Sequence, residues 1–203
     1  KAAGVTKVVF ISSIGAQPDA RFKYLASRWA GEQALQRTGI PTTVLRFSHI
    51  LGEDGGLVAD FQRRSDFGPV IVIPGTGEQH SQPIIREDAA RCVVESISRV
   101  DLYGQTVELG GPEILTYLQL FDLFAAARGI TKRRVKIAIP LLEPMAAVLG
   151  ALMGTPITTP AQLTPLTHDH TPQTPPPPPP PSRVRPHPPP PPAQTHWKQR
   201  KVF

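Results

Sequence analysis

The chain has 203 residues, and 25 of them are prolines, 14 of which lie between positions 172 and 192. This composition excludes a packed core at the carboxyl end and predicts a folded part over residues 1–170 and a Pro-rich disordered tail over 171–203. Five of the six net positive charges belong to the tail, so the folded part, with 17 basic and 16 acidic residues, is nearly neutral. This balance argues against nucleic-acid binding by the folded part. The single cysteine, Cys92, excludes an internal disulfide and indicates a reducing compartment, so we expect a cytoplasmic protein.

The first elements follow the order strand, helix, strand. Residues 7–13 (KVVFISS) are a continuous apolar run, typical of a strand buried on both faces of a parallel sheet. A helix is predicted over 22–37 and a second buried strand over 42–47. Short connections between these elements favour a βαβ unit, and therefore an α/β fold with a parallel sheet covered by helices.

Further elements continue this pattern. We expect a short helix over 57–64, a third strand over 70–73 and a fourth over 106–109. Between the last two, a helix begins near Glu87, with Asp88 in its first turn. Its predicted apolar face consists of Ala89, Val93, Val94 and Ile97.

The last part of the folded region begins with a helix capped by Thr116 and stopped by Gly129. A basic run over 132–136 is interpreted as a solvated edge leading into a strand, with contact to an anionic lipid surface as the alternative. The apolar stretch 137–153 favours an amphipathic helix on the domain or on a membrane surface, not a membrane span.

One group of polar residues can support chemistry. Ser12 and Ser13 end the first strand, and ligands of open parallel sheets bind at the carboxyl ends of strands. Tyr24 and Arg28 lie four residues apart on the following helix and therefore share a face. A fixed cation stabilises a phenolate, and a serine hydroxyl can hold a carbonyl while the tyrosine passes the proton. The alternative is an ordinary strand end and a surface tyrosine–arginine pair.

These residues lie within six stretches that resemble the short-chain dehydrogenase/reductase superfamily. Within it the chain is similar to atypical members: the NmrA-like proteins and the NAD(P)-binding accessory subunit of respiratory complex I. The resemblance covers the whole folded part and implies a Rossmann-type sheet. The matching stretches are 3–9 (AGVTKVV), 11–16 (ISSIGA), 24–32 (YLASRWAGE), 45–52 (LRFSHILG), 82–90 (QPIIREDAA) and 108–113 (ELGGPE).

The resemblance implies a role for each site residue. Ser13 would polarise the substrate, Tyr24 would donate or accept the proton, and Arg28 would stand where the family has a lysine. Asp88 would be a structural acid at the start of its helix. Residues implied to lie beside the bound NAD or NADP are Ser12, Tyr24, Arg28, Phe47, Ser48, His49 and Ile50, with His49 also a candidate for the substrate pocket.

The chain departs from the family in two ways. Arginine at position 28 keeps the charge but cannot release a proton, which favours cofactor binding over turnover. No Gly-rich phosphate-binding turn is present, so we expect an amino-terminally truncated protein, the carboxyl-terminal part of a Rossmann-type domain with helices on both faces of its sheet. One edge of that sheet would then be unpaired, and we expect the chain to fold poorly alone.

Two functions follow. The first is an NAD(P)-dependent oxidoreductase that moves hydride to or from a carbonyl-class small molecule. The alternative is a non-catalytic dinucleotide-binding redox sensor or a respiratory or quinone-linked accessory protein, peripheral to the inner membrane. The preference between NAD and NADP is not predicted.

The remaining candidates are weaker. The tail is a ligand for proline-recognition modules, a disordered extension, or not native coding sequence. No metal site is predicted, although His168 and His170 flank Asp169. His80 has no evident acid–base partner, and Cys92 is interpreted as a core residue.

Overall fold

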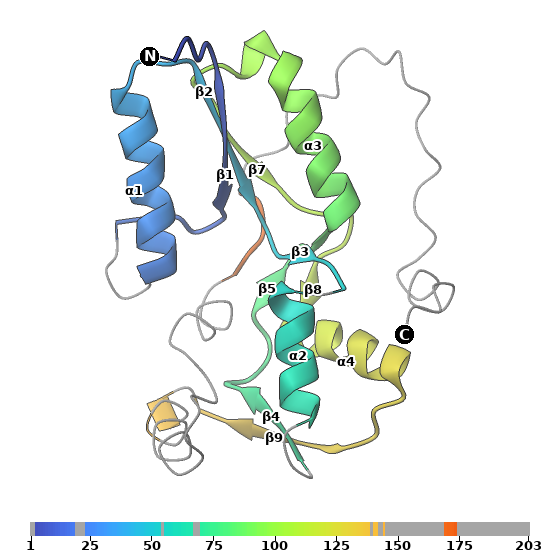
Figure 1. Cartoon of the computed structure of the whole chain (residues 1–203). Helices are drawn as coiled ribbons and strands as arrows, with labels where there is room; N and C mark the ends of the chain where they lie inside the picture. The colour runs from blue at the N-terminus through green and yellow to red at the C-terminus, as the bar shows by residue number, and fades with distance from the viewer. Residues whose placement is uncertain are drawn as a thin grey trace.

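The structure is a computed structural model that describes residues 3–18, 23–53, 55–66, 70–138, 140–141, 144 and 169–173. Its central sheet has three parallel strands in the order β1-β2-β7: β1 (Val8–Ser13), β2 (Thr42–Phe47) and β7 (Thr106–Leu109). The helices α1 (Lys23–Arg37) and α3 (Arg86–Ser98) lie on opposite sides of this sheet (Figure 1). The α/β fold class with a parallel, helix-covered sheet is therefore confirmed, and the predicted bounds of β2 and β7 match the observed ones.

A second group of elements lies at the carboxyl ends of the central strands (Figure 1). Its helices are α2 (Gly56–Asp66) and α4 (Tyr117–Arg128). Three two-stranded sheets accompany them. They pair β3 (Ile50–Leu51) with β6 (Ile84–Ile85), β4 (Val70–Pro74) with β9 (Arg133–Ile137), and β5 (His80–Ser81) with β8 (Leu115–Thr116); η1 (Val100–Leu102) is a short 3₁₀ turn before β7.

The buried apolar residues form two clusters. One lies between β2, β7 and α3, with Leu45 and Phe47 at its centre. The other lies between α2, β4 and α4, and Phe61 packs there edge-on against Tyr117 and Phe121, with ring centroids 5.1 and 5.2 Å apart. Edge-to-face rings stabilise such a cluster beyond the burial of their area.

The helix α4 has the ends that the sequence predicts. Thr116 caps it: the Thr116 hydroxyl accepts from the Gln119 backbone N–H while the Gln119 side chain accepts from the Thr116 N–H. Gly129 ends it with φ = 66°, a left-handed conformation that a residue without Cβ adopts at low cost. This helix therefore begins and ends where local chemistry dictates.

Two predictions about burial were wrong. Ser12 is the only buried residue of β1, and Ile11 is 45% exposed, because β1 is the edge strand of the sheet within the described residues. On α3, Ala89 is buried as expected, but Val94 and Ile97 are 66% and 59% exposed.

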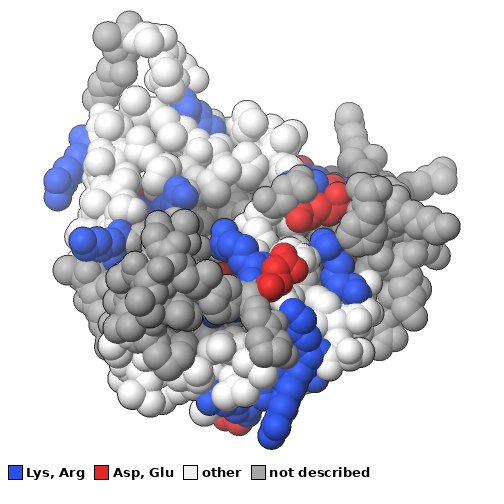
Figure 2. Space-filling model, turned by 60° about the horizontal axis from the view of Figure 1, so that its bottom comes forward, with Lys and Arg blue, Asp and Glu red and all other residues white. Residues whose placement is uncertain are grey.

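The basic run lies on the strand β9 itself and not before it. Its Arg133, Arg134 and Lys136 are exposed, and Arg134 forms an ion pair with Asp122 of α4. Lys132 donates to the carbonyl of Ser65 at 2.6 Å. Figure 2 shows this end of the molecule, where lysine and arginine side chains are interspersed with a few carboxylates.

Among the residues that the structure describes, no helix has the length and apolar character needed to cross a bilayer. The amphipathic helix predicted over 137–153 lies almost entirely outside the described residues.

Candidate functional site

The tyrosine and the arginine of α1 lie together beside β1. The Arg28 guanidinium lies over the Tyr24 ring, 5.0 Å from its centroid, which is cation–π geometry. The Arg28 Nη1 atom also donates to the carbonyl of Ile11 at 3.2 Å. Tyr24 is 43% exposed, so its phenol is accessible to a ligand. The predicted pair is therefore assembled and attached to the strand that ends in the two serines.

The Ile11 carbonyl belongs to the open edge of the sheet. Val8 N–H donates to Pro41 and Ile14 N–H donates to Phe47, both on the β2 side at 3.0 Å. In a parallel pair alternate residues bond to the same neighbour, so the even-numbered residues of β1 face β2. The backbone of Ile11 faces the other way. Arg28 thus donates to the Ile11 carbonyl, which no strand among the described residues bonds to.

The two serines have different surroundings. The Ser12 hydroxyl is buried and donates to Glu32 Oε1 of α1 at 2.5 Å, so it is not accessible to a cofactor. The Ser13 hydroxyl is half-buried and lies 3.3 Å from the carbonyl of Ile14. Ser13 begins the turn that includes Gly15, and Leu25 of α1 lies against that glycine. Of the two, only Ser13 has a hydroxyl that is not bonded to a carboxylate of α1.

A buried ion pair, which sequence reasoning missed, fixes α1 to the sheet. Glu32 accepts from Arg46 Nε at 2.9 Å and from Arg46 Nη2 at 2.7 Å, in addition to Ser12. The hydrogen bond to Glu32 raises the pKa of Arg46. Ser12, Arg46 and Glu108 are register partners across β1, β2 and β7, so the polar row crosses the sheet. Arg28 and Glu32 lie one turn apart on α1, so the same contact sets the rotation of the helix that carries Tyr24.

The residues after β2 form a second buried polar group. His49 Nδ1 lies 2.7 Å from the Ser81 hydroxyl, which is 3.3 Å from the Ser48 hydroxyl. The His49 ring also contacts that of His170, with centroids 4.4 Å apart. Burial, with a smaller contribution from His170, lowers the pKa of His49 to about 3, so the imidazole is neutral at physiological pH. No polar atom lies within hydrogen-bond distance of His49 Nε2 among the described residues.

Phe47 and Ile50, on either side of Ser48 and His49, are less available for contact with a ligand. Phe47 is fully buried in the cluster under α3, so its ring points into the core, not toward a ligand. Ile50 is partly exposed and pairs with Ile84 in the β3–β6 ladder. Ser81 and His170 were not predicted as site residues, because both come from segments far from His49 in sequence.

The remaining candidates have structural explanations. His80, expected to lack a partner, lies 3.7 Å from Asp169, whose carboxylate also accepts from the His80 N–H at 2.7 Å. Asp88 lies in the first turn of α3 and pairs with Arg91 at 3.3 Å, and the helix begins at Ile85 without a side-chain cap. Burial raises the pKa of the Cys92 thiol, which suits a core residue. No cluster of three metal-ligating side chains occurs within the described ranges.

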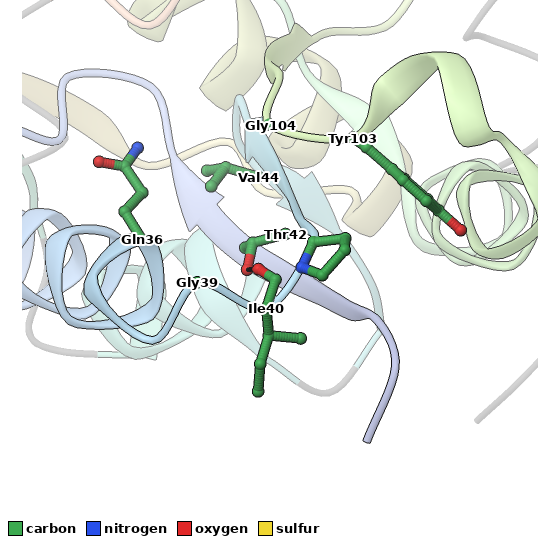
Figure 3. Close-up of a pocket in the computed structure, with 8 residues that line it drawn as sticks. Gln36, Gly39, Ile40, Thr42, Val44, Tyr103 and Gly104 are labelled. Carbon is green, nitrogen blue, oxygen red and sulfur yellow. Dashed lines mark hydrogen bonds between the residues drawn. The ribbon is translucent and has the colours of Figure 1, made fainter. Parts of the chain in front are cut away.

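A pocket with a volume of about 360 Å³ lies at the opposite end of the sheet (Figure 3). It is lined by residues before and at the start of β2, including Gly39, Pro41 and Thr42, and by Tyr103 and Gly104 before β7. Thr42 begins β2, so this pocket is at the amino ends of the strands. It is therefore separate from the serines and from His49, which lie at or beyond the carboxyl ends.

No family model matches the chain. The chain is 26% identical over 148 residues to NADH dehydrogenase [ubiquinone] 1 alpha subcomplex subunit 9, mitochondrial, of Arabidopsis thaliana, covering 71% of this chain and 36% of the relative. It is 23% identical over 167 residues to the NADH-ubiquinone oxidoreductase 40 kDa subunit, mitochondrial, of Neurospora crassa, covering 81% and 43%. The chain thus spans less than half the length of these curated relatives.

Solved structures share the fold. UDP-glucose 4-epimerase of Thermotoga maritima, solved with UDP-glucose, has a TM-score of 0.56 at 23% identity, over 68% of this chain and 52% of that one. UDP-glucuronic acid 4-epimerase of Bacillus cereus, solved with UDP-glucuronic acid and NAD, has a TM-score of 0.56 at 16% identity, over 65% and 48%. The resemblance to atypical short-chain dehydrogenases/reductases and to the complex I accessory subunit is confirmed, by the curated relatives in sequence and by these structures in fold.

Proposed function

We propose that this chain forms the nicotinamide side of an NAD(P)-binding protein of the atypical short-chain dehydrogenase/reductase type. The observation that carries the proposal is the position of Arg28, over the Tyr24 ring and bonded to the strand that ends in Ser13. The proposal is supported by a phenol and a cation beside β1 and by a hydroxyl-bearing turn at the carboxyl end of that strand, since open parallel sheets bind ligands at the carboxyl ends of strands. The buried Nε2 atom of His49, which has no hydrogen-bond partner among the described residues, is a further polar group, beyond the carboxyl end of β2.

Each residue has a role in this proposal. A bound nicotinamide cofactor would supply or accept the hydride. Ser13 would orient the substrate oxygen, Tyr24 would move the proton at that oxygen, and Arg28 would stabilise the phenolate and hold the cofactor ribose. Glu32 does not touch the ligand and would act by fixing the rotation of α1. Ser12, bonded to Glu32, would support the site without contacting the cofactor.

The test is a turnover assay of the purified protein with NADH and with NADPH against a panel of carbonyl compounds. We expect Tyr24→Phe to abolish turnover while leaving cofactor affinity within about threefold. Arg28→Lys should raise turnover, because lysine restores a charge that can relay a proton. Arg37→Lys, in the last turn of α1, is the matched control and should change neither quantity.

A second candidate function is a non-catalytic accessory protein of a respiratory complex, peripheral to the inner membrane. Two observations favour it: an arginine stands in the lysine position, and the curated relatives are named as mitochondrial NADH dehydrogenase subunits. Cofactor binding without turnover in either the native protein or Arg28→Lys would support this function. Turnover that depends on Tyr24 would exclude it.

A further inference from the structure

A short segment from the carboxyl-terminal region crosses the candidate site. We call residues Asp169–Gln173 the strap. Its His170 N–H donates to the His80 carbonyl at 2.8 Å, and the Gln82 N–H donates to the His170 carbonyl at 3.2 Å, so the strap extends the β5 segment as a parallel bridge. In Figure 1 it is the orange segment that passes the lower ends of β1, β2 and β7.

The strap is attached at both ends as well as at its centre. At its start the Asp169 carboxylate accepts from the His80 N–H at 2.7 Å. At its centre the Ser48 hydroxyl donates to the His170 carbonyl at 2.5 Å. At its end the Gln173 N–H donates to Glu108 Oε2 at 2.7 Å, so the packed part of the chain continues to Gln173. The strap therefore joins the residue after β2 to β7, across the carboxyl edge of the sheet.

The side chain beneath the strap is His49. The His170 ring contacts it; His170 is fully buried, whereas His49 is half-buried and its Nε2 atom is buried. The His49 Nε2 atom has no polar partner there, and a buried polar atom without a hydrogen bond disfavours the conformation that buries it. The unpaired Nε2 atom therefore disfavours the closed strap, whereas the hydrogen bonds of the strap with backbone, hydroxyl and carboxylate groups favour it.

We propose that the strap is a gate: it closes the carboxyl edge of the sheet over His49 and must open before a ligand can contact that imidazole. The hydrogen bonds at the two ends of the strap, made by Asp169 and Gln173, are exposed to solvent, so we expect the strap to open without unfolding of the sheet. A ligand group that bonds to Nε2 favours the open state, because it satisfies an atom that the closed state leaves unpaired.

The ligand chemistry that fits His49 is an uncharged group that both donates and accepts. The buried imidazole is neutral, so it offers no charge to an anion. Its Nε2 is a donor or an acceptor according to the tautomer that the Ser81 contact selects, and a primary carboxamide pairs with either. This part of the inference rests on the proposed function, since the nicotinamide carboxamide is such a group.

The test of the gate needs no cofactor. Diethyl pyrocarbonate acylates accessible neutral imidazoles, and peptide mass spectrometry assigns the modified histidine. In the full chain we expect His49 to react at least tenfold more slowly than His80, whose side chain is 54% exposed. Asp169→Ala removes a charge-assisted hydrogen bond and should accelerate modification of His49 by roughly tenfold. Asp101→Asn, an equally exposed carboxylate paired with Arg99, is the matched control and should leave the rate unchanged.

Hydrogen exchange on the native protein provides a second measurement, and it does not depend on a substitution that could itself disturb folding. We expect the amides of His170 and Gln82 to exchange together, at least tenfold faster than the amides of β2, which need the sheet to open. The gate is excluded if His49 and His80 react at equal rates, or if the strap amides exchange only with those of β2. Protection of His49 by NADH in Asp169→Ala would support the carboxamide contact. A working gate without that protection would overturn the contact alone.

Discussion

The strands β1 and β2 are neighbours of equal length, and the more apolar of the two is the less buried. β1 reads VVFISS, yet only Ser12 in it is fully buried, whereas β2 reads TTVLRF and is buried at every position except Arg46. The difference arises from position. β2 has a strand on each side, whereas β1 has β2 on one side and no strand from the described part of the chain on the other. Burial in this sheet therefore follows strand order more than side-chain hydropathy.

The polar residues of β2 are tolerated because each has a partner. Thr42 donates to the carbonyl of Ile40 at 2.8 Å and Thr43 to that of Leu102 at 2.9 Å. Arg46 is neutralised by Glu32. Buried polar groups cost little when they are hydrogen-bonded, so a central strand can carry them.

The largest expected effect tests the link between the two strands. Glu32→Ala leaves half-buried Arg46 with only the 4.0 Å contact to Glu108 and should lower the free energy of unfolding by about 3 kcal/mol, as for other broken buried ion pairs. Urea denaturation followed by circular dichroism measures this change. Glu87→Gln, at an exposed pair on α3, is the control and should change stability by less than about 0.5 kcal/mol. Equal effects of the two substitutions would show that Glu32 does not join α1 to the sheet.

The next prediction compares the strands directly. Leu45→Ala in β2 removes a side chain that is 2% exposed and should cost about 3 kcal/mol, by lost burial and a residual cavity. Ile11→Ala in β1 should cost less than about 1 kcal/mol, because nearly half of that side chain already contacts water. The same denaturation experiment measures both. Similar losses at the two positions would mean that the edge of β1 is covered in solution.

A smaller effect concerns pH and the segment beyond β2. The pKa of His49 is lowered to about 3 in the folded state, so the unfolded chain binds more protons below its ordinary value near 6.5. Stability should therefore fall as the pH falls from 6.5 toward 3, by about 2 kcal/mol between pH 6.5 and 5 from this group alone. Thermal denaturation across that range measures the slope. His49→Gln should flatten it, and an unchanged slope would contradict the burial of His49.

The smallest effect tests how closely α1 lies against β1. A Cβ at Gly31 would be 2.7 Å from Phe10 Cζ, so Gly31→Ala should destabilise by about 1 kcal/mol as the ring shifts. In a helix that alanine would otherwise be favourable by a similar amount. A stabilised variant would show that Phe10 moves freely and that the edge strand is loosely packed.

Local sequence patterns predicted where helices and strands lie, whereas long-range contacts determine how those elements pair and which of their residues are buried. The residues of β2 and β7, and the Thr116 and Gly129 ends of α4, were predictable because run length, caps and glycine act within a few residues. The wrong predictions concern the burial of β1 and α3 and the partner of His80, and the pairing of β4 with β9 was not predicted; all of these depend on contacts across a long sequence separation. The Tyr24–Arg28 pair was predictable from helical spacing, whereas Ser81 and the strap reach His49 from segments that no local pattern connects.

The hydrogen bond from Arg28 to Ile11 has a consequence for any chain that extends this sheet. A parallel strand laid along β1 would present backbone amides to the carbonyls of the odd-numbered residues, including that of Ile11. It would compete with the guanidinium for the same oxygen and leave Arg28 with its contact to the Tyr24 ring. Addition of a strand to β1 would therefore release Arg28 from the Ile11 carbonyl while Arg28 still contacts Tyr24. The same side chain bonds to the edge of the sheet here and is the cation of the proposed site.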